Sequence, residues 1–229
     1  MRRIILTAVV ALLVVSSGCV GLITGDTVEF EANESSVDGG ELASAGYEAN
    51  NSTERSITRD VSFLGQERTI RIVNHINRYT KNGTLANATG NETLATAVDR
   101  DRVNSTSVPD AARFVVVSTP GAKVLGQTLN PAASWSNERI LEEVADQTGQ
   151  LNDVDTEDTR TVDSLGEERN VTEFSATTQI EGREVEVRAH AVSFEHEGDV
   201  LITVGVHPEE MDETDNVDAL ISGLEHSGN

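Results

Sequence analysis

The chain has 229 residues, and its 39 acidic side chains outnumber 17 basic ones to give a formal net charge of −22. Nucleic acids and anionic membrane surfaces bind clusters of Lys and Arg, so this charge argues against both as partners. The acids are spread between apolar segments rather than massed in one disordered tail. Such a surface suits molar salt, in which the Debye length falls to about 3 Å and like charges are screened.

The N-terminal residues predict an export signal. Arg2 and Arg3 precede the uncharged run at 4–15, and three small residues then lead to Cys19, the single cysteine. This order resembles the lipobox of bacterial and archaeal lipoproteins, which implies a signal peptide at 1–18 and a lipid on Cys19. The lipobox usually has Leu or Val three places before the cysteine, where this chain has Ser16.

An uncleaved membrane anchor is the alternative, because residues 4–23 form an uncharged run of about the length of a spanning helix. Both interpretations keep Arg2 and Arg3 in the cytoplasm and place the rest of the chain on the outer face of the cytoplasmic membrane. The arginine pair is compatible with export by either the general secretory route or the twin-arginine route.

After the signal we expect a tether at 19–36 and a single domain at 37–229 with a polar insertion at about 82–108. Half of the Asn-x-Ser/Thr sequons lie in that insertion, which suggests an exposed segment open to N-glycosylation. The eight sequons are at Asn33, Asn50, Asn51, Asn82, Asn87, Asn91, Asn104 and Asn170.

The first half of the domain predicts one short helix and three strands. Asp38 as N-cap and Gly46 as stop indicate a helix at 38–46. Alternating β-branched residues predict strands at 53–64 and 67–79, joined at 64–66. The run at 113–121 has too many consecutive apolar residues for a strand with one wet face, which indicates a buried central strand.

The second half predicts two helices around four more strands. Residues 136–148 carry one apolar stripe and are followed by Gly149, which is typical of a helix end. Strands follow at about 157–165, 168–180, 183–196 and 199–207, and short turn-forming links between the last three predict antiparallel hairpins. A final amphipathic helix is expected at 215–226. We expect 113–119 and 199–207 to pair as inner strands, with both long helices covering the same sheet or its edges.

One internal repeat relates the two halves. The segments at 58–68 and 159–169 share seven of eleven positions. The favoured interpretation is a pair of equivalent hairpins, and the alternative is a basic site that grips carboxylates or sulfates through the repeated arginines. Those arginines are Arg59, Arg68, Arg160 and Arg169.

The C-terminal part resembles the PsbP and LpqN-like α+β fold, through "STP" after the buried strand, "LGEERNVTEF", "GDVLITVGV" and the last helix. This resemblance implies an antiparallel sheet of six to seven strands flanked by two to three helices. From "GCVGLITGD" through "GQTLNPAASWS" to "HPEEMD" the chain resembles a family of uncharacterised haloarchaeal surface lipoproteins. The resemblance implies no catalytic residue.

Candidate metal ligands are sparse. His190 and His196 share a strand face but lie about 20 Å apart, too far for one ion, although His207 on a neighbouring strand offers a closer partner. The alternating acids at 152–158, Asp153, Asp155 and Glu157, invite a calcium interpretation, but the Gly that an EF-hand loop needs is absent. No metal or cofactor is therefore expected.

Signals for catalysis are equally thin, since no nucleophile elbow, Ser-x-x-Lys motif or phosphate-binding loop occurs. Trp135 is either a binding anchor or, by preference, a core residue.

We therefore expect a lipid-anchored, non-catalytic binding or accessory module of a halophile, with an unknown protein or small apolar ligand as partner. A carrier of an apolar ligand or lipid is the alternative, recognisable by a cavity lined by strand residues. A surface hydrolase ranks third, recognisable by Ser or a carboxylate touching His.

Overall fold

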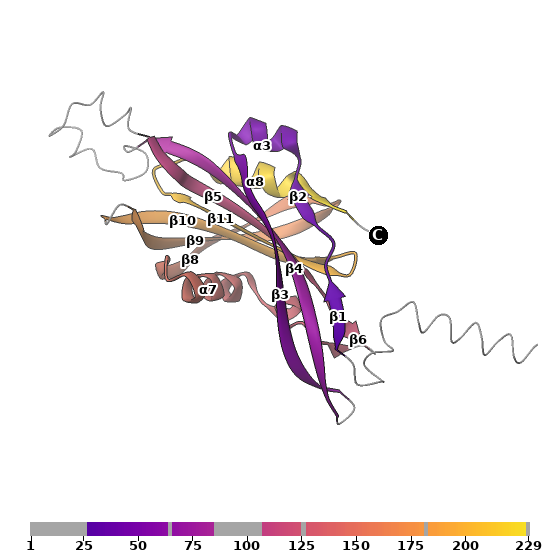
Figure 1. Cartoon of the computed structure of the whole chain (residues 1–229). Helices are drawn as coiled ribbons and strands as arrows, with labels where there is room; N and C mark the ends of the chain where they lie inside the picture. The colour runs from indigo at the N-terminus through magenta and orange to yellow at the C-terminus, as the bar shows by residue number, and fades with distance from the viewer. Residues whose placement is uncertain (1–26, 64–65, 85–106, 125–126, 181–182, 228–229) are drawn as a thin grey trace, which may run out of the picture.

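All long strands that the structure describes join one eight-stranded sheet (Figure 1). The computed structural model describes residues 27–63, 66–84, 107–124, 127–180 and 183–227. Across the sheet the order is β3, β4, β5, β11, β10, β9 and β8, and β1 pairs with the part of β4 that β5 leaves free. These strands are β1 (Val28–Glu31), β3 (Glu48–Phe63), β4 (Gln66–Thr84), β5 (Ser107–Pro120), β8 (Asn152–Ser164), β9 (Glu167–Ile180), β10 (Arg183–His196) and β11 (Asp199–Pro208).

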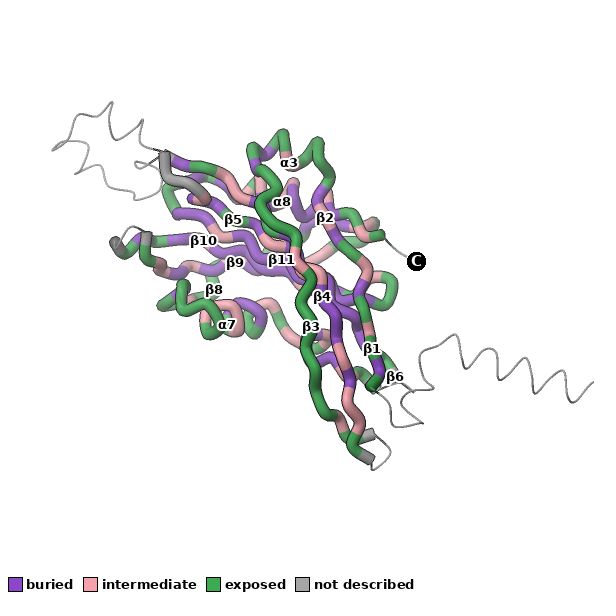
Figure 2. The backbone as a smooth tube through the Cα atoms, in the orientation of Figure 1, coloured by how far each residue is buried: buried purple, intermediate pink, exposed green. Residues whose placement is uncertain are grey.

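The α+β class and the predicted central strands are confirmed. Residues 113–119 lie within the β5–β11 ladder, in which Val115 is opposite Val204. β11 is buried along nearly its whole length, so both of its faces are covered. Figure 2 shows that the strands in the middle of the sheet are buried, whereas β3 is exposed at its edge. A strand covered on both faces has a continuous apolar sequence, which is the pattern that predicted it.

The predicted hairpins are also present. Leu165 and Gly166 both have positive φ, 52° and 80°, between β8 and β9. Glu197 and Gly198 have φ of 49° and 93° between β10 and β11. Two successive positive-φ residues form the turn whose twist matches that of the flanking strands. β9 and β10 pair directly up to residues 180 and 183.

The first two helices begin and end where their capping residues predict. The Asp38 side chain accepts hydrogen bonds from the first turn of α3 (Gly39–Ala45), and Gly46 ends that helix in the left-handed conformation. Ser136 caps α7 (Asn137–Thr148), which follows the short 3-10 helix η1 (Pro131–Ser134), and Gly149 ends α7 at φ 60°.

The predicted last helix at 215–226 is too long. α8 (Thr214–Ser222) stops at Gly223, and β12 (Leu224–His226) pairs antiparallel with β2 (Ser35–Val37). Leu224 continues the apolar spacing of the helix into the same core, so the periodicity could not show the change of backbone. A further two-stranded ladder joins β6 (Lys123–Val124) to β7 (Gln127–Thr128).

The helices cover opposite faces of the sheet. α3 and α8 pack together on one face, where the first core cluster includes Phe114, Leu201 and Leu220. α7 packs on β8, β9 and β10 on the other face, where the second cluster includes Leu141 and Phe174. In Figure 1 α3 and α8 accordingly lie above the sheet and α7 below it.

Two predicted boundaries need correction. The segment expected to be a tether, 19–36, includes β1 and most of β2, because Val28 pairs with Ile70 and buries its side chain. β1 raises the strand number to eight and makes one pairing parallel. The polar insertion is shorter than 82–108, since Gly83 and Thr84 still pair with Val108 and Ser107. Its middle part, 85–106, lies outside the described residues.

Candidate binding groove

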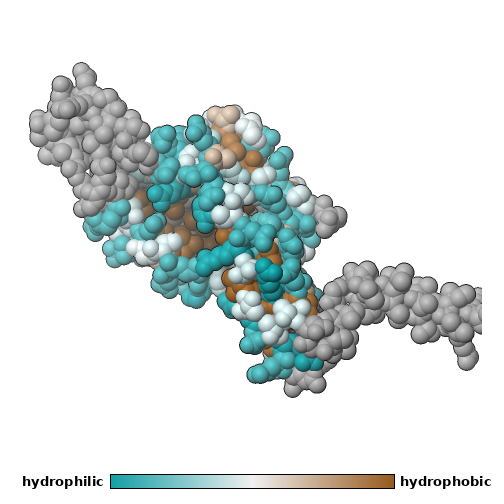
Figure 3. Space-filling model, viewed as in Figure 1, coloured by the Kyte–Doolittle hydropathy of each residue, from teal (hydrophilic) through white to brown (hydrophobic). Residues whose placement is uncertain are grey.

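A groove of about 1330 Å³ lies on the α7 face of the sheet. One side is formed by β3 and β4, and the other by η1, Trp135 and α7. It exists because α7 covers only the β8–β10 side of this face. Figure 3 shows hydrophobic surface in a hollow between the β3–β4 hairpin and α7, bordered by hydrophilic residues.

The floor of the groove is apolar. Residues two apart on a strand share a face, so alternate positions of five neighbouring strands point into the same space. Ile57 is 38% exposed and is the one large apolar side chain that the described residues leave exposed. The branched aliphatic lining residues from strands are Ile57, Ile72, Ile76, Val115, Val117, Val187, Ile202, Val204 and Val206.

Four arginines line the same groove: Arg55, Arg59, Arg78 and Arg113. Within the described part of the chain none of the four forms an ion pair with a carboxylate, whereas Arg71 and Arg139, which lie outside the groove, both do. Arg78 donates to the Thr53 hydroxyl at 3.1 Å, and Arg113 donates to the carbonyl oxygen of Asp110 at 3.3 Å. In a chain of net charge −22 this is a local concentration of positive charge.

Asn74 and Trp135 add a polar and an aromatic group to this groove. Asn74 is 8% exposed, and its Oδ1 has no hydrogen-bond partner among the described residues. A buried amide oxygen without a donor costs about 1–3 kcal/mol, which an N–H or O–H donor brought beside it on ligand binding could recover. Trp135 is half-buried, packs against the second core cluster and lines the groove, so it is both a core and a groove residue.

A buried polar network occupies the opposite face, beneath α8. His190 and His207 are 0% and 2% exposed, and their Nε2 atoms are 2.9 Å apart. Arg160 binds both carboxylate oxygens of Asp218 through its Nε, at 2.9 and 2.8 Å, and its Nη2 lies 3.1 Å from Nδ1 of His190. His196, six residues further along β10, contacts the ring of His226.

The hydrogen bonds of this network assign one proton to each histidine. Nδ1 of His207 is 2.9 Å from the carbonyl oxygen of Pro208 and must donate to it. Its Nε2 is then an acceptor for His190, whose Nδ1 in turn accepts from Arg160. Both rings are therefore neutral. Burial lowers the pKa of His190 to about 3, helped by the positive charges nearby, and burial also lowers the pKa of His207.

A serine does touch a histidine, as the hydrolase hypothesis required. Ser35 Oγ lies 2.7 Å from Nδ1 of His226, whose Nε2 is 3.3 Å from Oδ2 of Asp199. Ser35 is only 2% exposed, and none of the three residues lines the groove. Ser35 and His226 are direct partners in the β2–β12 ladder, so their contact fastens the C-terminal strand to β2.

The other candidate sites remain separate. Arg59 and Arg160 do not form a shared basic site, since β3 and β8 are the two edges of the sheet. The described residues contain no group of three ligands that could hold a metal ion. The acids at 152–158 lie in the exposed first half of the edge strand β8. The repeat interpretation as two hairpins agrees with the pairing of β3 with β4 and of β8 with β9.

The predicted modification sites are only partly within the described residues. Asn50, Asn51, Asn82 and Asn170 are exposed, and the half-buried Asn33 donates its side-chain amide to Asp199 at 3.2 Å. Cys19, Asn87, Asn91 and Asn104 lie outside the described residues. No helix among the described residues has the length and hydropathy needed to cross a membrane.

Sequence reasoning missed three of the four groove arginines, Arg55, Arg78 and Arg113, and named Arg59 only as part of the repeat. The spacing of Arg55, Ile57 and Arg59 puts them on one face of a strand, and that pattern was available. What the sequence could not show was that Arg78 and Arg113 come from neighbouring strands to the same face.

The fold and groove together define a class: an α+β domain whose curved sheet carries a half-covered apolar face edged by arginines. The chain belongs to the family Domain of unknown function (DUF6517), whose model matches residues 34–225. No curated protein matches the chain.

The solved structures that are similar to this chain include a cyanobacterial and a Pseudomonas aeruginosa protein. The solution structure of cyanobacterial PsbP (CyanoP) from Synechocystis sp. is 12% identical, with a TM-score of 0.35, and the match covers 86% of this chain and 93% of that one. A protein of unknown function from Pseudomonas aeruginosa is 19% identical, with a TM-score of 0.25, over 47% of this chain and 66% of that one. At these scores neither structure indicates what this chain binds.

Proposed function

We propose that this protein is a non-catalytic binding module that takes an elongated apolar molecule into the groove between β3–β4 and α7. The observation that carries the proposal is the apolar floor of a groove of about 1330 Å³. Small-molecule sites are typically concave and mostly apolar, with a few polar groups that fix orientation. Here the strands supply the apolar floor, and the arginines with Asn74 supply the polar groups.

The same proposal places the module at the outer face of the cytoplasmic membrane of a halophile, attached through a lipid on Cys19. The basic start, apolar run and single cysteine of the N-terminus support this location. The large excess of acids over bases supports a surface suited to molar salt. An anchored protein would have the groove available to molecules at the membrane surface.

Binding can be tested with a neutral apolar probe, N-phenyl-1-naphthylamine, in molar salt. Trp135 is the single tryptophan and lines the groove, so energy transfer from it to the probe reports binding there. Ile76→Gln places a polar group on the half-buried groove floor and should weaken binding by roughly ten-fold. Ile57→Gln is the variant with least risk to folding, since Ile57 is already 38% exposed.

Leu42→Gln is the matched control, because Leu42 is a half-buried apolar residue on α3, on the opposite face of the sheet. It should leave probe binding unchanged. Equal binding by the wild type, both groove variants and the control, with all melting normally, would show that the groove is not a binding site.

A further inference from the structure

We infer that the molecule held in this groove is an amphiphile with one anionic head group, which Arg55 and Arg78 grip beside Asn74. This inference rests on the proposed function and adds the charge of the ligand to it. The occupant is a single long apolar chain that ends in an oxyanion, a carboxylate or a phosphate. Guanidinium groups bind both of these oxyanions through paired N–H donors.

The charge of the groove is the first reason. Arg71, Arg160 and Arg188 each pair with a carboxylate outside the groove, which is unsurprising in a chain with 39 acids. The arginines in the groove have no such partner among the described residues. The lining acids are Asp110 and Glu143, and Glu143 is already 3.0 Å from Arg139. An anion bound here would therefore meet positive charge that the protein does not itself neutralise.

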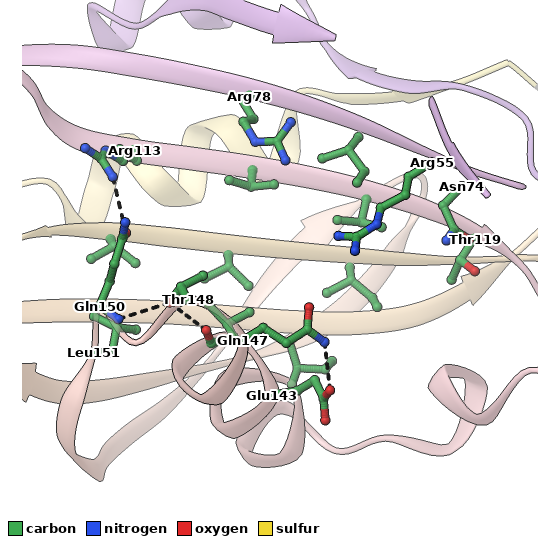
Figure 4. Close-up of a pocket in the computed structure, with 18 of the residues that line it drawn as sticks. Arg55, Asn74, Arg78, Arg113, Thr119, Glu143, Gln147, Thr148, Gln150 and Leu151 are labelled. Atoms are coloured by element: carbon green, nitrogen blue, oxygen red, sulfur yellow. Dashed lines mark hydrogen bonds between the residues drawn. The ribbon is translucent and has the colours of Figure 1, made fainter. Parts of the chain in front are cut away.

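The placement of the side chains is the second reason. Arg55 on β3 is the ladder partner of Asn74 on β4, and Arg78 lies four residues further along β4 on the same face. Four residues of strand span about 13 Å, a distance that two extended arginine side chains can bridge by reaching toward each other. In Figure 4 Arg55 and Arg78 extend from the β3–β4 side into the groove, and Asn74 lies at the Arg55 end.

The buried Asn74 is the third, independent reason. It is 8% exposed, lines the groove, and its Oδ1 lacks a partner among the described residues. An amide in this position can turn to donate an N–H to a bound oxyanion while its oxygen accepts from Arg55. Because Val and Ile dominate the floor, the rest of the ligand is an apolar chain.

The test compares amphiphiles that share a ten-carbon chain and differ only in the head group. Decyl phosphate, decanoate, decanol and decyltrimethylammonium are titrated below their micelle concentrations into the protein in molar NaCl, with Trp135 emission as the readout. We expect at least one of the two anions to bind roughly ten-fold more tightly than the alcohol, and the cation most weakly. Whichever anion binds more tightly identifies the oxyanion.

Two variants with the same change in charge separate the groove from the rest of the surface. Arg55→Gln should lower the affinity for the anion by roughly ten-fold and leave decanol binding unchanged. Arg71→Gln is the control, because Arg71 is on the opposite face of the same sheet, 2.8 Å from Glu29, and it should change neither affinity. Arg55→Lys keeps the charge but loses the paired donors, so its affinity for the anion should fall between those of the wild type and Arg55→Gln.

The outcomes distinguish this inference from the proposed function. If decanol and both anions bind with equal affinity, and Arg55→Gln does not change these affinities, the inference of an anionic head group is wrong. The proposal that the groove binds an apolar molecule would not be affected. Failure of all four amphiphiles and of the neutral probe to bind would remove both proposals.

Discussion

Cys19 is the residue whose role the N-terminal sequence predicts most directly. If it carries the lipid, Cys19→Ser should leave the precursor uncleaved or shed the protein into the medium, because the serine hydroxyl cannot replace the thiol in lipidation. Electrophoretic size and detergent partitioning of the cell fraction measure this. A mutant with unchanged size that still partitions into detergent would favour the uncleaved helix at residues 4–23.

The buried histidines illustrate how one residue's chemistry depends on its neighbours. His190 stays neutral because Arg160 donates to its Nδ1 and leaves its Nε2 proton for His207. Protonating His207 would place two donors face to face at 2.9 Å, and protonating His190 would set its Nδ1–H against the Arg160 Nη2 donor at 3.1 Å. The pair is thus a satisfied part of the core rather than a metal site, and it links β8, β10 and β11 to the Asp218 carboxylate of α8.

At the level of elements, the approach of α8 to the sheet depends on Gly205. A Cβ at this position would lie 3.2 Å from both methyl carbons of Val217 and 3.4 Å from the Phe114 ring. We expect Gly205→Ala to destabilise the protein by about 1–3 kcal/mol, because all three residues are buried and closely packed. Urea unfolding of the chain without its first 25 residues measures the change.

A double-mutant cycle tests the cause. Val217→Ala removes the two methyl groups, so the double variant should be less destabilised than the sum of the single variants by more than about 0.5 kcal/mol. Gly39→Ala is the control, since a Cβ there has nothing within 4 Å. Strict additivity of Gly205→Ala and Val217→Ala would show that α8 does not depend on this contact.

For the whole molecule, the charge predicts a dependence of stability on salt. Lowering salt from molar to about 0.1 M lengthens the screening distance from roughly 3 to roughly 10 Å, so that the acids repel one another more strongly. The edge strand β8 illustrates this, with Asp153, Asp155 and Glu157 all exposed. The melting temperature should therefore fall on dilution. A midpoint indifferent to chloride but raised by sulfate would instead indicate salt acting through hydrophobic burial.

The same stability should depend on pH in a direction that charge alone does not predict. Acidification removes carboxylate charge, but carboxylates titrate mainly near pH 4, whereas an unfolded histidine takes up a proton near pH 6.5. Folded His190 resists protonation down to about pH 3, and His207 is shifted in the same direction. The contribution of this neutral pair to the free energy of unfolding is therefore fully present above about pH 6.5. It is lost as the pH falls below that value, by up to about 1.4 kcal/mol per pH unit for each histidine.

Unfolding free energies between pH 7 and 5 in molar salt test this sign. We expect stability to fall over this range, and His207→Gln, which removes one of the two titrating rings, to have a shallower slope whatever its absolute stability. Rising stability from pH 7 to 5 in the wild type would show that carboxylate repulsion dominates.

The sequence by itself determined the local elements. The apolar pattern predicted the strands at the centre of the sheet, capping side chains predicted the helices α3 and α7, and the turn-forming residues predicted the turn before β11. All of these signals act over a few neighbouring positions. The same local signals failed at 28–37 and 224–226. There the strands exist only because Val28 pairs with Ile70 and Leu224 with Val37, contacts between distant segments that no periodicity encodes.

Only the tertiary structure decided which charged and titratable side chains come together. Arg55, Arg78 and Arg113 are on three different strands, and their shared groove depends on strand order and on which part of the sheet α7 leaves uncovered. His190 and His207 likewise meet through the β10–β11 pairing. Strand order and register are set by the burial of the whole core, so one residue's neighbours across the sheet cannot be inferred from its neighbours along the chain.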